Sequence, residues 1–314
     1  MKNRNRYDCG FLYFYFMDKV LITGGTGLIG KRLSFLLQSK GYEVRLLSRN
    51  ENSSSKYPTF VWDIKKGIID EKAFEDLDYI IHLAGAGIAD KKWFDDRKKV
   101  IIDSRVESTK LLLKYTRDLR IPLKAFISSS AIGFYGSVTS EITFEENQNH
   151  GNDFIAEVCR LWENAIFEFE TESIRTVAIR TGIVLSKNGG ALKKMKTPII
   201  TPLGNGLQYM PWIHIDDLCK IYIQAIENDL MKGAYNGVAP EHETNITFSK
   251  KLATAFKRPF LPIGVPEFVL KAVFGEMATI LLNGSRISSE KIQASGFEFS
   301  FPLLKTALSD ISGK

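Results

Sequence analysis

The chain has 314 residues, of which 44% are hydrophobic, 25% charged and 11% aromatic. This composition excludes an intrinsically disordered or collagen-like protein, and the length suffices for a large α/β domain with a smaller lobe. The three cysteines form no CxxC pair, which argues against a disulfide framework or a zinc site and favours a reducing, cytoplasmic setting. Because 42 Lys and Arg residues exceed 36 Asp and Glu residues, the partner could be a nucleic acid, an anionic membrane or a phosphorylated ligand.

Residues 1–16, MKNRNRYDCGFLYFYF, join a basic stretch to a short aromatic run. The run is shorter than the apolar part of a secretory signal, and no cleavage site of small residues follows it. We interpret the segment as a non-structural extension before Met17, with a membrane-contacting or partner-binding tail as the alternative. No other apolar run approaches the ~18–20 residues needed to cross a bilayer, so we expect no membrane span.

Strand-like and helix-like runs alternate from residue 19 onward. The predicted strands are 20–23, 42–48, 59–62, 79–84, 125–129, 177–183 and 234–237. The predicted helices among them are 28–38, 93–117, 154–170 and 216–227. This alternation is typical of right-handed βαβ units, and it predicts an α/β fold with a Rossmann-type, doubly wound parallel sheet.

The alternation loosens after about residue 189, where Pro and Gly become frequent, and 262–310 is predicted to be mostly helical. We expect 17–185 to form the nucleotide-binding domain, with 212–240 contributing to it. Residues 186–211 and 241–314 would then form a smaller, mostly helical C-terminal substrate lobe. Open α/β sheets bind ligands at their carboxyl edge, so we expect this lobe to cover that edge.

Residues 23–30, TGGTGLIG, contain a GxxGxxG pattern between a predicted strand and a predicted helix. Glycine lets the backbone turn tightly and approach a pyrophosphate, while the helix start offers free N–H groups. In this segment we expect dinucleotide contacts from Gly24, Thr26, Gly27, Leu28, Ile29 and Gly30. Further cofactor contacts are expected after the other strands, from Asp63, Leu83, Ala84, Gly85 and Ser128.

The end of the second strand predicts which dinucleotide is bound. An NAD site would place a carboxylate there to hold the ribose hydroxyls, but residues 46–50 read LLSRN. Arg49, with Ser48 and with Arg32 from the first helix, suits a 2′-phosphate, so NADP(H) is the predicted cofactor. The alternative is that Arg49 is only a solvated charge at the end of a strand.

Several segments together resemble a known family. TGGTGLIG at 23–30, HLAGAG at 82–87, SSSAIGFYG at 128–136 and PWIHIDDL at 211–218 are similar to the extended (epimerase/dehydratase-type) short-chain dehydrogenases/reductases. IADKKW at 88–93, RTGIVLSKNGGAL at 180–192 and residues 275–299 resemble the "epimerase family protein" subgroup, which has a C-terminal domain of its own. The resemblance covers 18–311 and implies an NAD(P) cofactor, a small-molecule substrate and a monomer or homodimer.

The sequence departs from the family at the proton-transferring pair, a Tyr-x-x-x-Lys motif whose Lys holds the nicotinamide ribose. Counting from Glu163 puts Ile155 at the Tyr position and Cys159 at the Lys position, and neither side chain can do that work. The catalytic hydroxyl is retained at the end of the fifth strand as Ser129 or Ser130, of which we favour Ser130. As substitute acids or bases we favour Tyr135 and Glu157 over Cys159 and His214, although all four have ordinary structural explanations.

Four residues are candidates for substrate binding at the strand ends and in the smaller lobe: Arg180, Tyr209, Trp212 and Arg286. No helix-turn-helix, RNA-recognition or zinc-finger pattern is present, so neither a nucleic acid nor a metal is expected. The first hypothesis is an NADP(H)-dependent, epimerase- or dehydratase-like oxidoreductase without the usual Tyr/Lys pair. The alternative is a non-catalytic NADP(H)-binding redox sensor or regulator.

Overall fold

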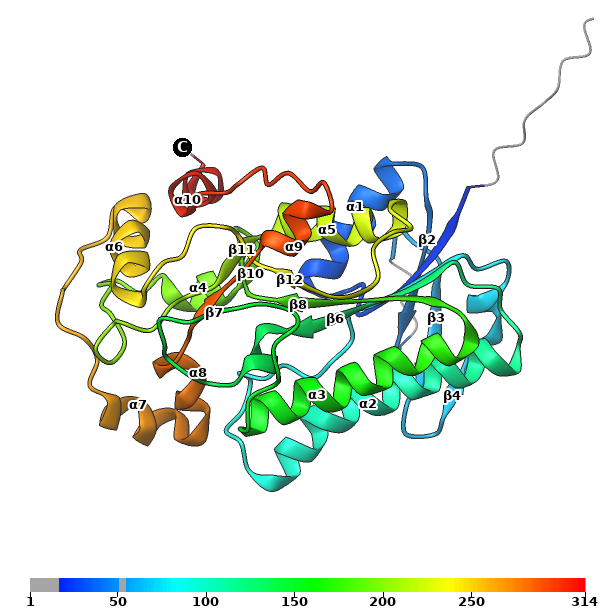
Figure 1. Ribbon diagram of the computed structural model, residues 1–314, viewed down its shortest axis with the longest axis horizontal. Coiled ribbons are helices and arrows are strands. Elements are labelled where there is room, and N and C mark those ends of the chain that lie inside the picture. The colour runs from blue at the N-terminus through cyan, green and yellow to red at the C-terminus, as the bar shows by residue number, and fades with distance from the viewer. Residues whose placement is uncertain (1–16, 51–54, 314) are drawn as a thin grey trace, which may run out of the picture.

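The computed structural model of the chain describes residues 17–50 and 55–313 (Figure 1). The interpretation of residues 1–16 therefore concerns a segment outside the described residues. At the centre lies an eight-stranded sheet in the order β12-β8-β6-β5-β1-β2-β3-β4, parallel except for the pair β3 and β4. Its strands are β1 (Lys19–Thr23), β2 (Glu43–Ser48), β3 (Thr59–Asp63), β4 (Ile68–Ile69), β5 (Tyr79–His82), β6 (Ala125–Ala131), β8 (Arg175–Thr181) and β12 (Gly233–Gly237). The predicted α/β fold with a doubly wound parallel sheet is confirmed.

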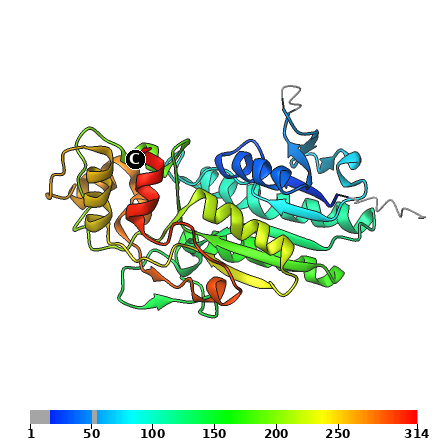
Figure 2. The same cartoon turned by 90° about the horizontal axis from the view of Figure 1, so that it is seen from above.

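Two pairs of helices cover the two faces of this sheet (Figures 1 and 2). Their bounds are α1 (Leu28–Ser39) and α5 (Ile215–Glu227) on one face, and α2 (Asp95–Asp118) and α3 (Phe154–Phe167) on the other. Val20 and Ile22 pack in the core beneath α1 and α5, whereas Leu21 between them packs in the core beneath α2 and α3. Because both faces of the central strands are buried, these strands read as continuous apolar runs, which is why the sequence predicted them. The two-residue edge strand β4 was not predicted.

The order of the strands reverses beside β1. The chain proceeds from β1 to β2 and β3 on one side, and then returns to place β5 and β6 on the other. The carboxyl ends of β1 and β5 are Thr23 and His82, which are paired in the sheet. A sheet of this kind binds ligands in the crevice above such a switch point, so a ligand site is expected at this edge.

The predicted strand over 177–183 is wrong at its end, because the chain leaves the main sheet at Gly182. The following residues form a second, three-stranded sheet, whose strands are β9 (Ile183–Ser186), β10 (Gly189–Gly190) and β11 (Trp212–His214). A Cβ at position 182 would lie 2.7 Å from the carbonyl oxygen of Pro211 and 2.8 Å from Cγ1 of Val238. Only glycine therefore fits where the two sheets meet.

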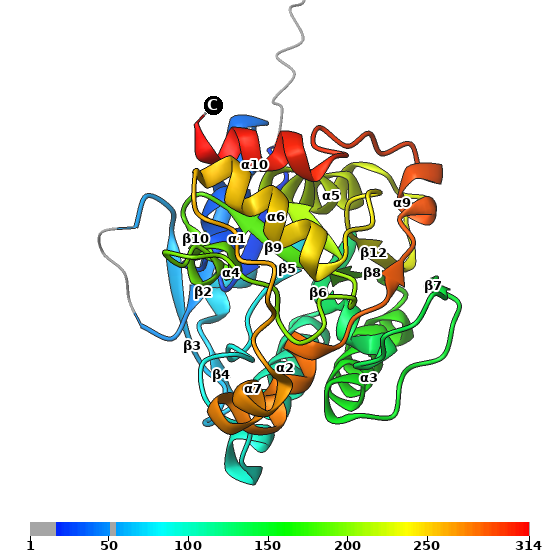
Figure 3. The same cartoon turned by 90° about the vertical axis from the view of Figure 1, so that its left-hand side faces the viewer.

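The smaller lobe lies beyond the carboxyl edge of the main sheet, where α6 packs against α10 (Figure 3). Its helices are α4 (Ala191–Met195), α6 (Asn245–Phe256), α7 (Glu267–Phe274), α8 (Thr279–Leu282) and α10 (Leu304–Ser312), whereas α9 (Glu290–Ala294) packs against β12 of the main sheet. A two-stranded sheet joins β7 (Thr143–Phe144) to β13 (Arg286–Ile287), and four short 3-10 helices cover Glu71–Phe74, Ile132–Tyr135, Glu168–Glu172 and Gly275–Ala278. The C-terminal part is thus largely helical, although α6 was not predicted. Within 17–50 and 55–313, no helix is long and apolar enough to cross a membrane.

Candidate functional site

A glycine-rich turn joins β1 to α1 at the switch point. Gly24 has a φ of +69°, and a Cβ on it would lie 2.9 Å from the carbonyl carbon of Leu83. A Cβ on Gly30 would lie 2.4 Å from the carbonyl oxygen of Gly24. A Cβ on Gly27 would meet only that same oxygen, at 3.2 Å. The fold itself therefore requires glycine at 24 and 30, whereas Gly27 borders space that a ligand can fill.

The amino end of α1 opens toward this space. Its N-cap residue, Gly27, has no side chain that could cap the helix. The first turn of α1 contains no acidic residue. The first N–H groups of a helix have no partner within it, so this end suits an anionic phosphate. A cavity of about 220 Å³ lies here, and its lining residues are Gly24, Gly27, Leu28, Ile29, Gly30, Leu83, Val184, Gly190 and Ala191. The cavity is thus bounded by the glycine turn on one side and by β9, β10 and α4 on the other.

A buried hydrogen-bond chain fixes the loop after β5. The Oγ1 of Thr23 accepts the N–H groups of Leu83 and Ala84, both at 3.1 Å, which leaves its proton for Nδ1 of His82 at 2.7 Å. The other ring nitrogen of His82 lies 3.0 Å from the hydroxyl of Ser108 on α2. Burial lowers the pKa of His82 to about 3, so the ring is neutral. The backbone that follows β5 is therefore held firmly beside the cavity.

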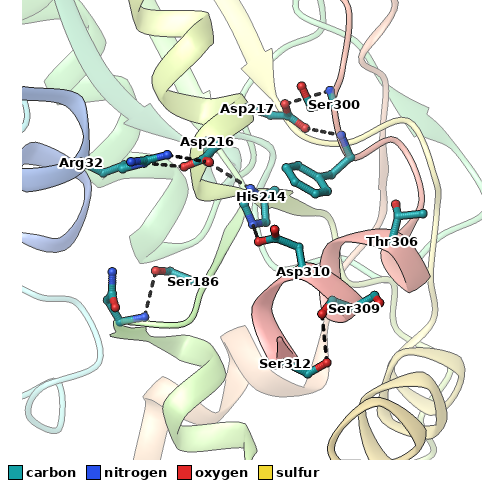
Figure 4. Close-up of polar contacts among 12 residues, drawn as sticks. Arg32, Ser186, His214, Asp216, Asp217, Ser300, Thr306, Ser309, Asp310 and Ser312 are labelled. Carbon is teal, nitrogen blue, oxygen red and sulfur yellow. Dashed lines mark hydrogen bonds and ion pairs between the residues drawn. The ribbon is translucent and has the colours of Figure 1, made fainter. Parts of the chain in front are cut away.

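The two arginines expected at a 2′-phosphate lie in different environments. Arg49 is exposed at the end of β2 and makes no hydrogen bond or ion pair with any other described residue. Arg32 donates from Nε and Nη2 to the two carboxylate oxygens of Asp216, at 2.7 and 2.9 Å (Figure 4). Arg49 is therefore free to meet a ligand, whereas most of the Arg32 guanidinium is already engaged.

Asp216 also belongs to a structural cluster around His214 (Figure 4). Nδ1 of His214 accepts the N–H of Asp216 at the start of α5, and Nε2 lies 3.3 Å from Oδ2 of Asp310 on α10. Burial lowers the pKa of His214, although the nearby carboxylates oppose the shift. Asp217 accepts the backbone N–H of Ser300, at 2.9 Å. This cluster fastens the C-terminal segment to α5, which is the ordinary structural explanation for His214.

The positions of the missing Tyr/Lys pair are filled by apolar packing. Ile155 and Cys159 are buried on α3 in one cluster with Trp93 and Met277. A Cβ on Gly133 would lie 2.2 Å from Cγ2 of Ile155, so the two segments are in close contact. Burial raises the pKa of Cys159 to about 12, which keeps the thiol protonated. No proton relay runs through these two positions.

A buried polar network lies at the carboxyl ends of β6, β8 and β12. Glu163 on α3 accepts Nε and Nη2 of Arg180 at 2.9 and 2.8 Å, and the hydroxyl of Ser130 at 2.7 Å. Tyr135 accepts from Nη1 of Arg180 at 3.0 Å and donates to Oδ1 of Asn236 at 2.8 Å. Burial raises the pKa of Tyr135 to about 12, so its proton stays in this bond. Ser130, Tyr135 and Arg180 are only 2–3% exposed.

Comparison with known proteins gives the family. Residues 20–157 match the model of the NAD dependent epimerase/dehydratase family, and residues 265–311 match a domain of unknown function, DUF1731. Epimerase family protein SDR39U1 of Mus musculus is 36% identical over 303 residues, which cover 93% of this chain and 99% of the relative. Epimerase family protein SH2119 of Staphylococcus haemolyticus is 33% identical over 301 residues, with 94% and 99% covered. The chain belongs to this epimerase family.

Solved structures agree with the assignment to the epimerase family. The crystal structure of human epimerase family protein SDR39U1 with NADPH has a TM-score of 0.83 and 33% identity, covering 94% of this chain and 99% of that one. UDP-N-acetylglucosamine 4-epimerase of Bacillus cereus has a TM-score of 0.75 at 17% identity, with 94% and 98% covered, and shares the fold. The predicted resemblance to the epimerase/dehydratase type, with its own C-terminal domain, is confirmed.

The structure brings some of the predicted site residues of the chain together and separates others. Leu83, Ala84 and Gly85 follow β5 beside the glycine turn, whose Thr26 is exposed. Asp63 ends β3 and accepts the N–H of Lys66, at 3.1 Å. The remaining cofactor candidates, Ser48 and Ser128, lie at the end of β2 and inside β6, where the Ser128 hydroxyl donates to a backbone carbonyl at 3.0 Å.

The catalytic and substrate candidates form separate groups. Ser130, Tyr135 and Arg180 share the buried network, whereas Glu157 is paired with Arg160 on the outer side of α3, at 2.7 and 2.6 Å. Tyr209 and Arg286 bond to each other and to Glu141. Trp212 is fully buried in the core of the smaller lobe. The functional roles of all these residues remain predictions.

Three residues around the site were not among the expected ones. Glu163 joins Ser130 to Arg180, Asp216 holds Arg32, and Arg105 lies beneath the loop after β5. Glu163 and Arg105 carried a detectable signal, because each is a charge on the apolar side of a predicted helix. Asp216 carried no such signal in the sequence, because its partner Arg32 lies 184 residues away.

Proposed function

We propose that the chain binds NADP(H) in the crevice above β1 and β5 and acts as an oxidoreductase on a small carbonyl-type substrate. The observation that carries the proposal is the glycine turn, whose open Gly27 and uncapped α1 border the cavity of about 220 Å³. The human relative crystallised with NADPH supports the choice of nucleotide. The absence of a carboxylate at the end of β2 supports it independently.

The residues at the crevice fit such a ligand. The first N–H groups of α1 would hold the pyrophosphate, and the exposed Arg49 with Ser48 would hold the 2′-phosphate. The backbone of Leu83–Gly85, fixed by Thr23, would support the nicotinamide half. Bound NADPH supplies a hydride to a substrate carbon or, when oxidised, accepts one.

The side chains of this chain restrict which reaction is possible. Sugar epimerisation needs a base at a hydroxyl group, but Ile155 and Cys159 provide none, and Tyr135 keeps its proton in a bond to Asn236. Reduction of a carbonyl-type acceptor can instead draw its proton from water. We therefore favour reduction over epimerisation. A cytoplasmic setting and a monomeric or homodimeric state remain predictions.

The burial of the polar network also favours a second candidate function. Ser130, Tyr135 and Arg180 are held by one another and by Glu163, so none is directed at a substrate in this arrangement. A protein that binds NADP(H) and reports its redox state to a partner would need no directed acid or base. Such a regulator would bind NADP(H) at the same site as the proposed oxidoreductase and would differ from it only in transferring no hydride to a substrate.

One experiment separates the two functions. NADPH binding is measured by calorimetry, and NADPH oxidation is then followed at 340 nm with aldehyde, ketone and quinone acceptors in turn, with NADH as the matched control. Turnover with any acceptor class, at a higher kcat/KM with NADPH than with NADH, would establish the oxidoreductase. Tight binding without turnover would establish the regulator. Failure to bind NADPH would overturn both.

A further inference from the structure

Arg105 is a buried arginine beneath the loop that follows β5. Its Nη1 donates to the carbonyl oxygens of Ala86 and Ile101, at 3.1 and 3.0 Å. A Cβ on Gly85 would lie 3.2 Å from the Cζ of Arg105, so the guanidinium rests directly against the backbone of this loop. The residue is 8% exposed. The positive charge is thus placed immediately behind the segment expected to support the nicotinamide half of the nucleotide.

The charge of Arg105 has no carboxylate partner among the described residues. Its Nε is buried without a hydrogen-bond partner, and its Cζ lies 5.0 Å from the ring of Trp162. Burial lowers the pKa of Arg105, and a second cation, Arg97, lies close enough for its charge to lower that pKa further, but Arg97 itself has a carboxylate neighbour, Asp90, at 3.9 Å. The other buried arginine of this region, Arg180, holds both oxygens of Glu163. Burying an unpaired charge is costly, and no carboxylate in contact with it neutralises its field.

Arg105 also lies next to the position of the missing lysine. Cys159 and Trp162 are three residues apart on α3, so they lie on the same side of the helix, and Arg105 reaches that side from α2. The positive charge of Arg105 favours the thiolate form of Cys159 and so opposes the effect of burial on its pKa. A cation is therefore present beside position 159, although position 159 itself is neutral.

We propose that Arg105 supplies from α2 the positive charge that Cys159 lacks, and that this charge makes the site bind NADPH more tightly than NADP⁺. The nicotinamide ring of NADP⁺ carries a positive charge that NADPH does not. An unpaired cation behind the loop destabilises the oxidised form relative to the reduced form. Arg105 acts through its field and contacts no reacting atom, and the inference rests on the proposed NADP(H) site.

The test compares the dissociation constants of NADPH and NADP⁺ by calorimetry in the wild-type protein and in three variants. Arg105→Met removes the charge and keeps much of the volume, whereas Arg105→Lys keeps the charge. Arg160→Met is the matched control, because Arg160 lies on the outer side of α3 and, among the described residues, forms its ion pair with Glu157. We expect the wild type to bind NADPH about tenfold more tightly than NADP⁺, a difference of ~1.4 kcal/mol.

The expected pattern is that Arg105→Met loses this preference, while Arg105→Lys and Arg160→Met retain it. An unchanged ratio in folded Arg105→Met would overturn the inference and leave the NADP(H) site intact. Equal binding of the two nucleotides by the wild type would overturn it as well, and that measurement does not depend on whether Arg105→Met folds. A wild type that binds neither nucleotide would overturn the proposed function and this inference with it.

Discussion

Asp216 on α5 holds the guanidinium of Arg32 on α1 through two hydrogen bonds, across 184 residues of sequence. The pair ties together the two helices that cover one face of the sheet. It also separates the roles of the two arginines that the sequence had placed at the nucleotide phosphate. We therefore expect the recognition of a 2′-phosphate to depend on Arg49 rather than on Arg32, and two predictions follow from this separation.

Arg49→Glu should weaken NADPH binding at least tenfold and leave NADH binding within about twofold of the wild type. The variant exchanges a cation for an anion beside the 2′-phosphate, and hydrogen bonds to charged groups contribute ~1.5–3 kcal/mol each. Calorimetric titration with both nucleotides provides the measurement. Arg258→Glu, an equal change of charge at an exposed residue of the smaller lobe, is the control. An equal loss of NADH and NADPH affinity would rule out a 2′-phosphate site at Arg49.

Arg32→Met should leave the preference for NADPH over NADH unchanged and lower stability by about 1 kcal/mol. The side chains of Arg32 and Asp216 are 36% and 27% exposed, so solvent screens the pair and its contribution is modest. Urea unfolding measures the stability, and the two dissociation constants measure the preference. A selective loss of NADPH affinity would show instead that Arg32 leaves Asp216 to bind the phosphate.

Tyr135→Phe should destabilise the fold by ~1–3 kcal/mol without changing the affinity for NADPH. The substitution leaves Oδ1 of Asn236 without its donor and Nη1 of Arg180 without one acceptor, and both groups are buried. Urea denaturation and nucleotide titration are the measurements. If an acceptor is turned over, a loss of kcat well beyond what the loss of folded protein explains would support Tyr135 as the catalytic acid.

Glu163→Gln should be far more destabilising than Glu157→Gln, although both remove one carboxylate from α3. Glu163 is buried and holds Arg180 at both oxygens, so its loss leaves an uncompensated buried charge, which typically costs 3–5 kcal/mol. Glu157 is paired with Arg160 at the surface, where such pairs contribute about 0–1 kcal/mol. Thermal unfolding compares the two variants. Similar melting temperatures would show that the buried network does not stabilise the fold.

His82 should make the protein less stable as the pH falls below about 6. The pKa of the folded state is lowered to about 3, whereas an unfolded histidine titrates near ~6.5, so below that value protons bind the unfolded state preferentially. The contribution is at most ~1.4 kcal/mol per pH unit and is complete near pH 3. His82→Asn should lose this part of the slope in urea titrations from pH 7 to pH 4. The exposed His150→Asn should keep it, and equal slopes in wild type and His82→Asn would contradict the assignment.

The sequence predicted the main sheet because its signals are local. The apolar run Val20–Ile22 and the glycines after it specify a strand and a turn without reference to distant residues. The helix α6, which was not predicted, also carries local signals: Thr244 accepts the N–H of Thr247 as an N-cap, and Phe248 and Leu252 have helical spacing.

The polar networks could not be predicted in the same way. Glu163 and Arg180 are separated by a helix end, a 3-10 helix and most of a strand, and only the packing of α3 on β8 brings them together. Arg105 presented a similar difficulty. Its place on the apolar side of the predicted helix marks it as an unusual charge, but the groups that it meets depend on how closely α2 and α3 pack.

The junction at Gly182 limits how the cleft can move. Only this one residue separates β8, in the main sheet, from β9, whose Val184 lines the far wall of the cavity. Pro211 and Val238 pack tightly against Gly182, so no flexible linker joins the main sheet to the β9 wall of the cavity at this point. We therefore expect a preformed groove of nearly constant width. A nucleotide would enter it without a hinge-bending closure of two domains.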